Sequence, residues 1–274
     1  MTQMQFSFYK YQGAANDFVL LDNRKGLISK DPKLFEAMCH RRTGIGADGV
    51  ILIENHPDFD FQMYYANSDG KPSSMCGNGG RCVVSFAHFL QIISDNCTFL
   101  AIDGKHEASI TEEGLISLGM NNVDSVVINQ ERAVLDTGSP HYIAFTENVK
   151  DIDVFTEGRS IRNSSEFKAE GINVNFIEYN EHDITIRTYE RGVEDETWSC
   201  GTGVCAAAIA TAIKNKEEGK LEYRLMTLGG VLSVRFQLKN GKATNVTLIG
   251  PAKQVFQGEY GTKETEIVKT VFKS

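Results

Sequence analysis

The chain has 274 residues, of which 41% are hydrophobic and 23% charged, proportions typical of a globular protein that buries a core. This length suits one large domain or two medium-sized domains. The formal net charge of −8 argues against a nucleic-acid ligand, because such ligands usually need a basic face, but it permits a small acidic substrate.

The N-terminal stretch and the cysteines indicate a cellular compartment. MTQMQFSFYKYQG lacks the basic start and apolar stretch of a secretory signal, and no apolar run approaches the roughly 18 residues of a membrane helix. We therefore expect a cytoplasmic protein that does not act at a membrane. Its six cysteines should then be free thiols. The spacings Cys76-x5-Cys82 and Cys200-x4-Cys205 differ from the tighter pairs of structural zinc sites, so we expect no metal.

The first elements in chain order are a helix and a strand. DPKLFEAMCHR predicts an amphipathic helix with Asp31 as N-cap and Pro32 as first helical residue. FDFQMYYANSDG, residues 59–70, alternates apolar and polar residues, which predicts a strand that ends in a turn. MCGNGG follows this strand, and RCVVSFAHFLQII then predicts a helix that is apolar on nearly every side.

The same succession occurs again in the second half of the chain. DITIRTYERG, residues 183–192, predicts a strand, SCGTG follows an acidic loop, and VCAAAIATAIKN predicts a second helix that needs to be enclosed. Alternating segments with turn signals follow both helices, at residues 98–120 and 222–250. We therefore predict an α+β fold of two similar halves, each a curved, mainly antiparallel sheet or barrel around a central helix.

Each Cys-Gly-x-Gly motif places a thiol at the start of a helix. The helix end carries partial positive charge, which favours a thiolate, and its amide groups can hold a carboxylate. If the two helix starts faced each other, one thiol would lie on either face of a substrate carbon. One thiolate would remove a proton and the opposite thiol would return one, which inverts the stereocentre without metal or pyridoxal cofactor.

Six blocks in order resemble the diaminopimelate epimerases of bacterial lysine and cell-wall synthesis. They are NDFVLLDN, GIGADG, NSDGKPSSMCGNGGRC, GSPH, GINVNF and ERGVEDETWSCGTGVCAAA. The resemblance implies epimerisation of LL-2,6-diaminopimelate to the meso form, no cofactor, and a homodimer. It also implies a first half over residues 1–130, completed by about 255–274, a second half over 131–254, and an active site in the cleft between them.

The resemblance also implies roles for individual residues. Cys76 and Cys200 match the catalytic thiols, and His141 and Glu190 match their polar partners. The amides of Gly77, Asn78, Gly201 and Thr202 match the holders of the reacting carboxylate. The positions that bind the rest of the ligand match Asn16, Asn67, Asn173, Glu190 and Arg191, with Arg191 suited to the distal carboxylate. Ser139 stands where many members have asparagine, and we give it a binding role as well.

Other conspicuous residues have structural interpretations. We expect Cys82, Cys97 and Cys205 to be core residues. HRRTGIGADG lacks the ending of a phosphate-binding loop and is interpreted as a structural turn near the site. Trp198 is predicted to be a packing anchor. The arginines at 41, 42 and 81 are equally compatible with structural and surface positions.

Three alternatives remain from the sequence. A proline or hydroxyproline racemase would share the two thiols, but those relatives characteristically have histidine where this chain has Asn78. A second enzyme type of the same fold replaces the first cysteine with an acid, whereas Cys76 is present here. In a redox or thiol-binding protein, Cys76 and Cys200 would instead form a disulfide.

Overall fold

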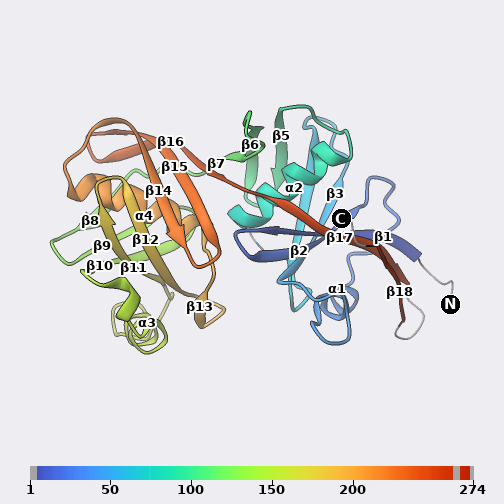
Figure 1. The fold of residues 1–274 in the computed structure, drawn as a ribbon, viewed down its shortest axis with the longest axis horizontal. Coiled ribbons are helices and arrows are strands. Elements are labelled where there is room, and N and C mark those ends of the chain that lie inside the picture. The colour runs from blue at the N-terminus through green and yellow to red at the C-terminus, as the bar shows by residue number, and fades with distance from the viewer. Residues whose placement is uncertain (1–4, 74, 262–265, 272–274) are drawn as a thin grey trace. The chain divides into compact units, whose positions relative to one another are not determined.

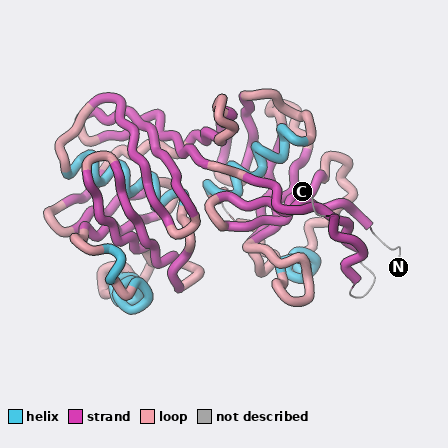
Figure 2. The backbone as a smooth tube through the Cα atoms, viewed as in Figure 1, coloured by secondary structure: helices cyan, strands magenta, loops and turns pink. Residues whose placement is uncertain are grey.

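The computed structural model describes residues 5–73, 75–261 and 266–271, and the chain divides into two compact units (Figures 1 and 2). Unit 1 comprises Met1–Ile116 and Pro251–Ser274, and unit 2 comprises Ser117–Gly250. Residues 262–265 and 272–274 of the predicted C-terminal segment lie outside the described residues.

Unit 1 contains a twisted sheet with the strand order β18-β17-β1-β2-β3-β4-β5-β6. Neighbouring strands run antiparallel except for the pairs β2–β3 and β4–β5, which are parallel. The strands are β1 (Gln5–Gly13), β2 (Asn16–Asp22), β3 (Gly49–Glu54), β4 (Phe61–Asn67), β5 (Asn96–Ala101), β6 (Gly104–Ile110), β17 (Lys253–Gly261) and β18 (Glu266–Val271). The helices are α1 (Pro32–Cys39) and α2 (Gly77–Phe89).

Unit 2 contains a sheet with the order β8-β9-β10-β11-β12-β14-β15-β16, parallel at β10–β11 and β12–β14. The strands are β8 (Val126–Ile128), β9 (Arg132–Asp136), β10 (Pro140–Phe145), β11 (Asn173–Asn180), β12 (Asp183–Glu190), β14 (Gly219–Thr227), β15 (Gly230–Lys239) and β16 (Lys242–Gly250). Short β13 (Asp195–Thr197) pairs with the end of β12. The helices are α3 (Val154–Arg162), α4 (Gly201–Lys214) and the 3₁₀ helix η1 (Val149–Asp151).

The two units follow the same path, which confirms the prediction of two similar halves. In each, an antiparallel strand pair leads through a crossover to a parallel neighbour, and a second crossover leads to a further strand pair. The first crossover contains α1 in unit 1 and α3 in unit 2. The second contains α2 or α4, which are the helices that begin at the two cysteine motifs.

The central helices pack as their composition predicts. Helix α4 contacts strands from β8 to β16, and its residues from Val204 to Ala212 are buried. Helix α2 packs against β1, β2, β3 and β6. Its last turn is less enclosed than the apolar pattern indicates, because Phe89 is 40% exposed and packs one side of its ring against Tyr9 and Phe86. Both curved sheets therefore surround a helix, as expected.

The sheet faces that point away from the central helices α2 and α4 are also covered, which the sequence patterns do not predict. In unit 1, Phe35 and Met38 of α1 join a core with Val19 and Leu21 of β2. In unit 2, Val154 of α3 joins a core with strand residues of β11 and β12. The innermost strands are thus buried on both faces, which explains continuous apolar runs such as FVLL and VILI. Asp31 caps α1 and Pro32 begins it, as predicted.

The boundary between the units lies earlier than the predicted position near residue 130. The stretch after Ile116 is bound to the last strand of unit 2, because β7 (Ile116–Gly119) pairs with β16 and Val123 bridges to Ala243. At the other boundary, unit 2 ends at Gly250 rather than at 254, and β17 pairs with β1 along nearly its whole length.

Candidate active site

Two cysteines occupy equivalent places in the two units. Cys76 is the N-cap of α2 and Cys200 is the N-cap of α4, both with extended backbone, and neither side chain caps its helix. The first amides of a helix have no partner within it and carry partial positive charge. The backbone at Gly77-Asn78 and at Gly201-Thr202 is therefore suited to hold an anionic group beside each sulfur.

Around Cys76, the structure brings together three of the predicted site residues. The Cys76 thiol lies 3.5 Å from Asn16 Oδ1, and Asn78 Nδ2 donates to the same oxygen at 3.3 Å. Asn16 Nδ2 donates to Asp48 Oδ2 at 2.5 Å. Asp48 belongs to the GIGADG turn, so this turn contacts the candidate site directly and positions Asn16.

Ion pairs and a buried arginine stabilise this arrangement. Arg41 forms ion pairs with Asp17 and Asp48 at 2.8 and 2.6 Å, and Lys10 lies 2.5 Å from Asp17. Arg81 is fully buried and donates to Gly77 O and to Asn78 Oδ1. Of the three arginines with open interpretations, Arg81 is therefore structural, and Arg41 is an exposed residue held in ion pairs.

Asn67 is less closely associated with the other predicted residues. It is exposed at the end of β4, where it pairs with Gly49 of β3, and its backbone forms hydrogen bonds with Gly70 and Lys71 in the following turn. Its predicted contact with a ligand stays a prediction.

Around Cys200, a second group of predicted residues comes together. The Cys200 sulfur lies 3.5 Å from Thr202 Oγ1, and His141 Nε2 lies 2.9 Å from the same hydroxyl. His141 and Thr202 come from β10 and α4, which lie against each other. The His141 ring is completely buried. The structure thus links His141 to Cys200 through one hydroxyl group.

Strand register places two further predicted residues in one row with His141. His141 on β10 pairs with Asn173 on β11, and Val174 pairs with Tyr189, so Asn173 lies opposite Glu190 at the end of β12. Asn173 Nδ2 donates to Ser139 Oγ at 2.9 Å and its Oδ1 accepts from the Arg191 backbone amide at 2.9 Å. The Arg191 guanidinium also donates to Ser139 Oγ at 3.4 Å, so Ser139 connects two of the predicted ligand-binding residues.

Burial sets the charge of His141. Loss of hydration, reinforced by the Arg191 charge, lowers the pKa of His141 from its ordinary 6.5 to about 3. The folded protein therefore keeps this ring neutral at pH values where the unfolded chain would protonate it.

This depressed pKa makes stability depend on pH. Below pH 6.5 the unfolded chain binds a proton that the folded chain does not bind until about pH 3, so stability is present above 6.5 and falls through that window. We expect the stability advantage of the wild type over His141→Gln to shrink by about 3 kcal/mol between pH 6.5 and pH 4. Urea unfolding of both proteins at several pH values measures this difference. Parallel stability curves would contradict the neutral buried ring.

Glycine at position 203 allows α4 to begin against the strands. A Cβ atom at Gly203 would lie 2.5 Å from Asn175 Oδ1 and 3.3 Å from the His141 ring. The second glycine of SCGTG is therefore required by close packing behind Cys200.

The cysteines interpreted as core residues are buried, as predicted. Cys82 and Cys205 have no exposed surface and Cys97 is 6% exposed. Burial raises the pKa of Cys82 and Cys97 to about 12, so both remain thiols. The prediction for Trp198 is wrong, because its side chain is 62% exposed just after β13.

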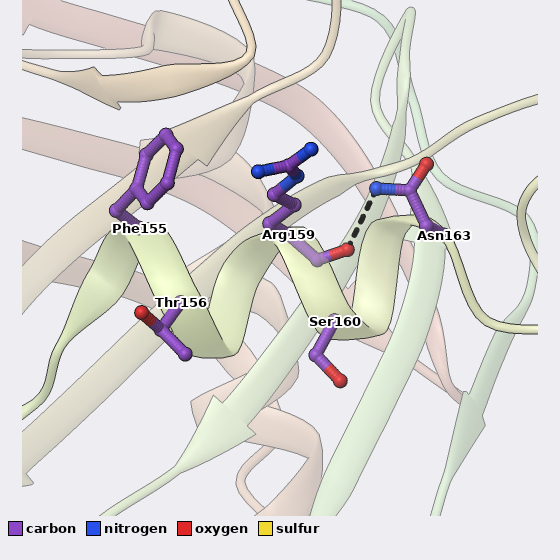
Figure 3. A pocket seen from close by; sticks show the side chains of 5 residues that line it. All are labelled: Phe155, Thr156, Arg159, Ser160 and Asn163. Atoms are coloured by element: carbon purple, nitrogen blue, oxygen red, sulfur yellow. Dashed lines mark hydrogen bonds between the residues drawn. The ribbon is translucent and has the colours of Figure 1, made fainter.

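One surface hollow lies apart from the predicted site residues. It is lined by Phe155, Thr156, Arg159, Ser160 and Asn163, all on α3 or at its C-cap (Figure 3). Asn163 Nδ2 donates to the Arg159 carbonyl across one turn of this helix (Figure 3). None of the predicted catalytic or binding residues lines this hollow.

Three residues that contact the predicted site residues or one another were not predicted from the sequence: Asp48, Asn175 and Thr188. Asn175 contacts His141 and Thr188, and Asp48 contacts Asn16. A signal for Asn175 was present, because a polar residue two positions after Asn173 on a strand shares its face, and the surrounding GINVNF is otherwise apolar. The role of Asp48 depends on the tertiary fold and has no local signature.

Within the described residues, no helix combines the length and the apolar character that crossing a membrane requires.

Comparison with known proteins identifies a family. Residues 8–126 and 133–255 match the sequence model of the family described as diaminopimelate epimerase. The diaminopimelate epimerase of Flavobacterium psychrophilum is 50% identical over 254 residues, covering 91% of this chain and 98% of that protein. The enzymes of Chlorobaculum tepidum and Aquifex aeolicus are 43% and 35% identical and cover 90% and 94% of this chain, and 98% and 99% of their own lengths.

Solved structures with little sequence similarity share the fold. A PhzF-family phenazine biosynthesis protein from Bacillus anthracis matches with a TM-score of 0.74 at 13% identity, covering 94% of this chain and 99% of that chain. A hydroxyproline epimerase from Agrobacterium vitis matches with a TM-score of 0.67 at 12% identity, covering 95% and 93% of the two chains. At these identities the similarity shows the fold alone.

Proposed function

Because the chain belongs to the diaminopimelate epimerase family, we propose that it interconverts LL-2,6-diaminopimelate and meso-diaminopimelate, with Cys76 and Cys200 as the two catalytic groups. The observation that carries this assignment is the equivalent placement of the two cysteines as N-caps of the central helices. The activity is that of an isomerase in amino-acid biosynthesis.

The proposed reaction uses one thiolate and one thiol. The thiolate removes the α-proton, and the opposite thiol donates a proton to the other face of the carbon, so the stereocentre inverts and each sulfur exchanges its protonation state. The two groups then titrate as a pair. This chemistry requires the two sulfurs to act on opposite faces of one substrate carbon.

Negative charge develops on the substrate while the α-carbon has no proton. Amides at the starts of α2 and α4 would hold the reacting carboxylate and stabilise that charge, with Gly77, Asn78, Gly201 and Thr202 as donors. Arg191 would bind the distal carboxylate, since its guanidinium presents parallel donors. The remaining proposed binding residues are Asn16, Asn67, Ser139, Asn173 and Glu190. The proposed reaction needs no cofactor and no metal.

The main alternative substrate is proline or hydroxyproline. The residue that argues against it is Asn78, which occupies the position where those racemases characteristically have histidine. In this structure Asn78 is fully buried and is held between Arg81 and Asn16, so its amide is a fixed part of the site. A redox role for the two cysteines has no comparable support, and their oxidation to a disulfide would inactivate a two-thiol enzyme.

Compartment and assembly complete the proposal. The six cysteines of the chain suit a reducing compartment, and we propose the cytoplasm. Homodimerisation remains a prediction from the family resemblance.

The proposed function is tested by following α-proton exchange in deuterated water. With LL-diaminopimelate we expect deuterium to enter the α-position as the meso form accumulates, and a parallel reaction with L-proline should show neither exchange nor racemisation. Turnover of proline without turnover of diaminopimelate would overturn the substrate assignment.

A further inference from the structure

The two cysteines at the helix starts face groups of opposite hydrogen-bonding character. Both are N-caps with extended backbone and both precede glycine, so the field of the helix end acts on the two sulfurs alike. Their side-chain partners differ: Cys200 lies 3.5 Å from the hydroxyl of Thr202, and Cys76 lies 3.5 Å from the amide oxygen of Asn16.

In unit 2, a chain of hydrogen bonds fixes the direction of each donor. The Tyr142 carbonyl can only accept, and it lies 3.1 Å from Asn175 Nδ2, so this side of the Asn175 amide is its NH₂ group. Thr188 Oγ1 donates to the other side, Asn175 Oδ1, at 2.9 Å. The Asn175 NH₂ group also lies 3.1 Å from His141 Nδ1, which must therefore accept.

An accepting Nδ1 determines the rest of the chain. The neutral His141 ring then carries its single proton on Nε2, which donates to Thr202 Oγ1 at 2.9 Å. That hydroxyl oxygen accepts from His141 and keeps its own hydrogen for donation, and the Cys200 sulfur lies 3.5 Å away, so we infer that the hydroxyl donates to this sulfur. A donor aimed at a sulfur stabilises the thiolate over the thiol.

In unit 1, the direction is reversed. The Asp48 carboxylate accepts from Asn16 Nδ2 at 2.5 Å, so Asn16 turns its oxygen toward Cys76. Asn78 supports this orientation by donating to the same oxygen, and its own oxygen is held by the Arg81 guanidinium at 2.8 Å. An acceptor facing Cys76 stabilises the thiol, which can donate, over the thiolate.

The charged and titratable groups around the two sulfurs come from several elements. In unit 2 they are His141 on β10 and, beyond it, Glu190 at the end of β12 and Arg191 directly after it, whose charge acts on His141. Around Cys76 they are Arg81 on α2 and Asp48 before β3, which is paired with Arg41; Arg41 is also paired with Asp17, which contacts Lys10.

We propose that Asn175 is a positioning residue that, through His141 and Thr202, prepares Cys200 as the thiolate of the free protein, while Cys76 remains the thiol. The catalytic meaning of this assignment rests on the proposed two-thiol reaction, in which Cys200 would be the base that acts first on the free enzyme. The assignment itself concerns the resting protein and is testable without substrate.

The test measures alkylation of each cysteine by iodoacetamide as a function of pH, with the modified peptides quantified by mass spectrometry. Iodoacetamide reacts with thiolates, so the order of the two pH midpoints reports which sulfur of the pair loses its proton first. We expect a lower midpoint for Cys200 than for Cys76 in the wild type. Buried Cys82 and Cys205 should stay unmodified, which verifies that the protein remains folded.

Two variants interrupt the chain at different points. Asn175→Leu removes the donor to His141 Nδ1, and Thr202→Val removes the hydroxyl that faces Cys200. Each should raise the Cys200 midpoint by about one to two pH units, as expected for loss of one hydrogen bond to a charged group. Thr202→Ser keeps the hydroxyl and should keep the wild-type midpoint. Thr211→Val, a buried threonine on the same helix, should move neither midpoint.

The outcome separates this inference from the proposed function. Equal midpoints, a lower midpoint for Cys76, or an unmoved Cys200 midpoint in Thr202→Val would overturn the assignment even in a fully active epimerase. Because Thr202→Val is a small change on the helix, it decides the question if Asn175→Leu does not fold. Conversely, the expected midpoints in a protein that does not turn over diaminopimelate would refute the proposed function and leave the assignment in place.

Discussion

Replacing Cys76 or Cys200 by alanine is expected to reduce epimerisation of diaminopimelate by about 10² to 10⁴-fold, the usual contribution of one general acid or base. Each variant retains only one of the two groups, so one face of the substrate carbon has no proton donor or acceptor. The effect should appear in kcat, with a smaller change in KM, because the sulfurs act on the proton that is transferred and bind no other part of the substrate. Steady-state kinetics with both isomers measure it.

Two other cysteines on the same helices provide matched controls. Cys82 on α2 and Cys205 on α4 are fully buried, so Cys82→Ala and Cys205→Ala test the loss of a thiol from each helix without changing its start. Both variants should retain activity within a few-fold, with modest losses of stability. Near wild-type activity in Cys76→Ala or Cys200→Ala would refute the two-thiol reaction.

Gly203→Ala is expected to lower the free energy of unfolding by about 1–3 kcal/mol and to abolish most of the activity. The added Cβ would lie 2.5 Å from Asn175 Oδ1, closer than non-bonded atoms approach. Asn175 is held by Thr188 and by the Tyr142 carbonyl, so it cannot move aside without breaking those hydrogen bonds. The helix would have to shift instead, and Cys200 would shift with it. Urea unfolding followed by circular dichroism measures the stability change.

Gly79→Ala is the matched control in the other central helix. There the nearest atom to an added Cβ is the terminal methyl of Ile51 at 3.2 Å, which lies at the far end of a flexible side chain. Alanine also favours the helical state over glycine by up to about 1 kcal/mol, so we expect little loss of stability. An equal loss in both variants would show that close contact with Asn175 is not the reason for glycine at position 203.

The sequence predicted those features that local patterns determine. Asp31 and Pro32 define the start of α1, and the alternation in residues 183–190 defines β12. The repeated succession of strand, Cys-Gly-x-Gly and apolar helix led to the two similar halves and to the cysteine pair. These patterns are local because hydrophobic periodicity and capping act within a few residues.

Features that depend on distant contacts were missed or misplaced. Asp48 acts on Asn16 across 32 positions of sequence, and Asn175 reaches His141 across 34. The unit boundary near residue 116 follows from strand pairing with β16, more than a hundred residues later. Trp198 is predicted to be a packing anchor, and only the fold shows that it is 62% exposed.

The pairing of β17 with β1 has a consequence for biosynthesis. Unit 2 is one continuous stretch, so its sheet can close once residue 250 has left the ribosome. The sheet of unit 1 pairs β1, near the beginning of the chain, with β17, near its end. This sheet is therefore incomplete until Lys253–Gly261 has also been synthesised. The half that is synthesised first is therefore the half that finishes folding last. Until β17 has been made, the edge of β1 that pairs with it stays unpaired.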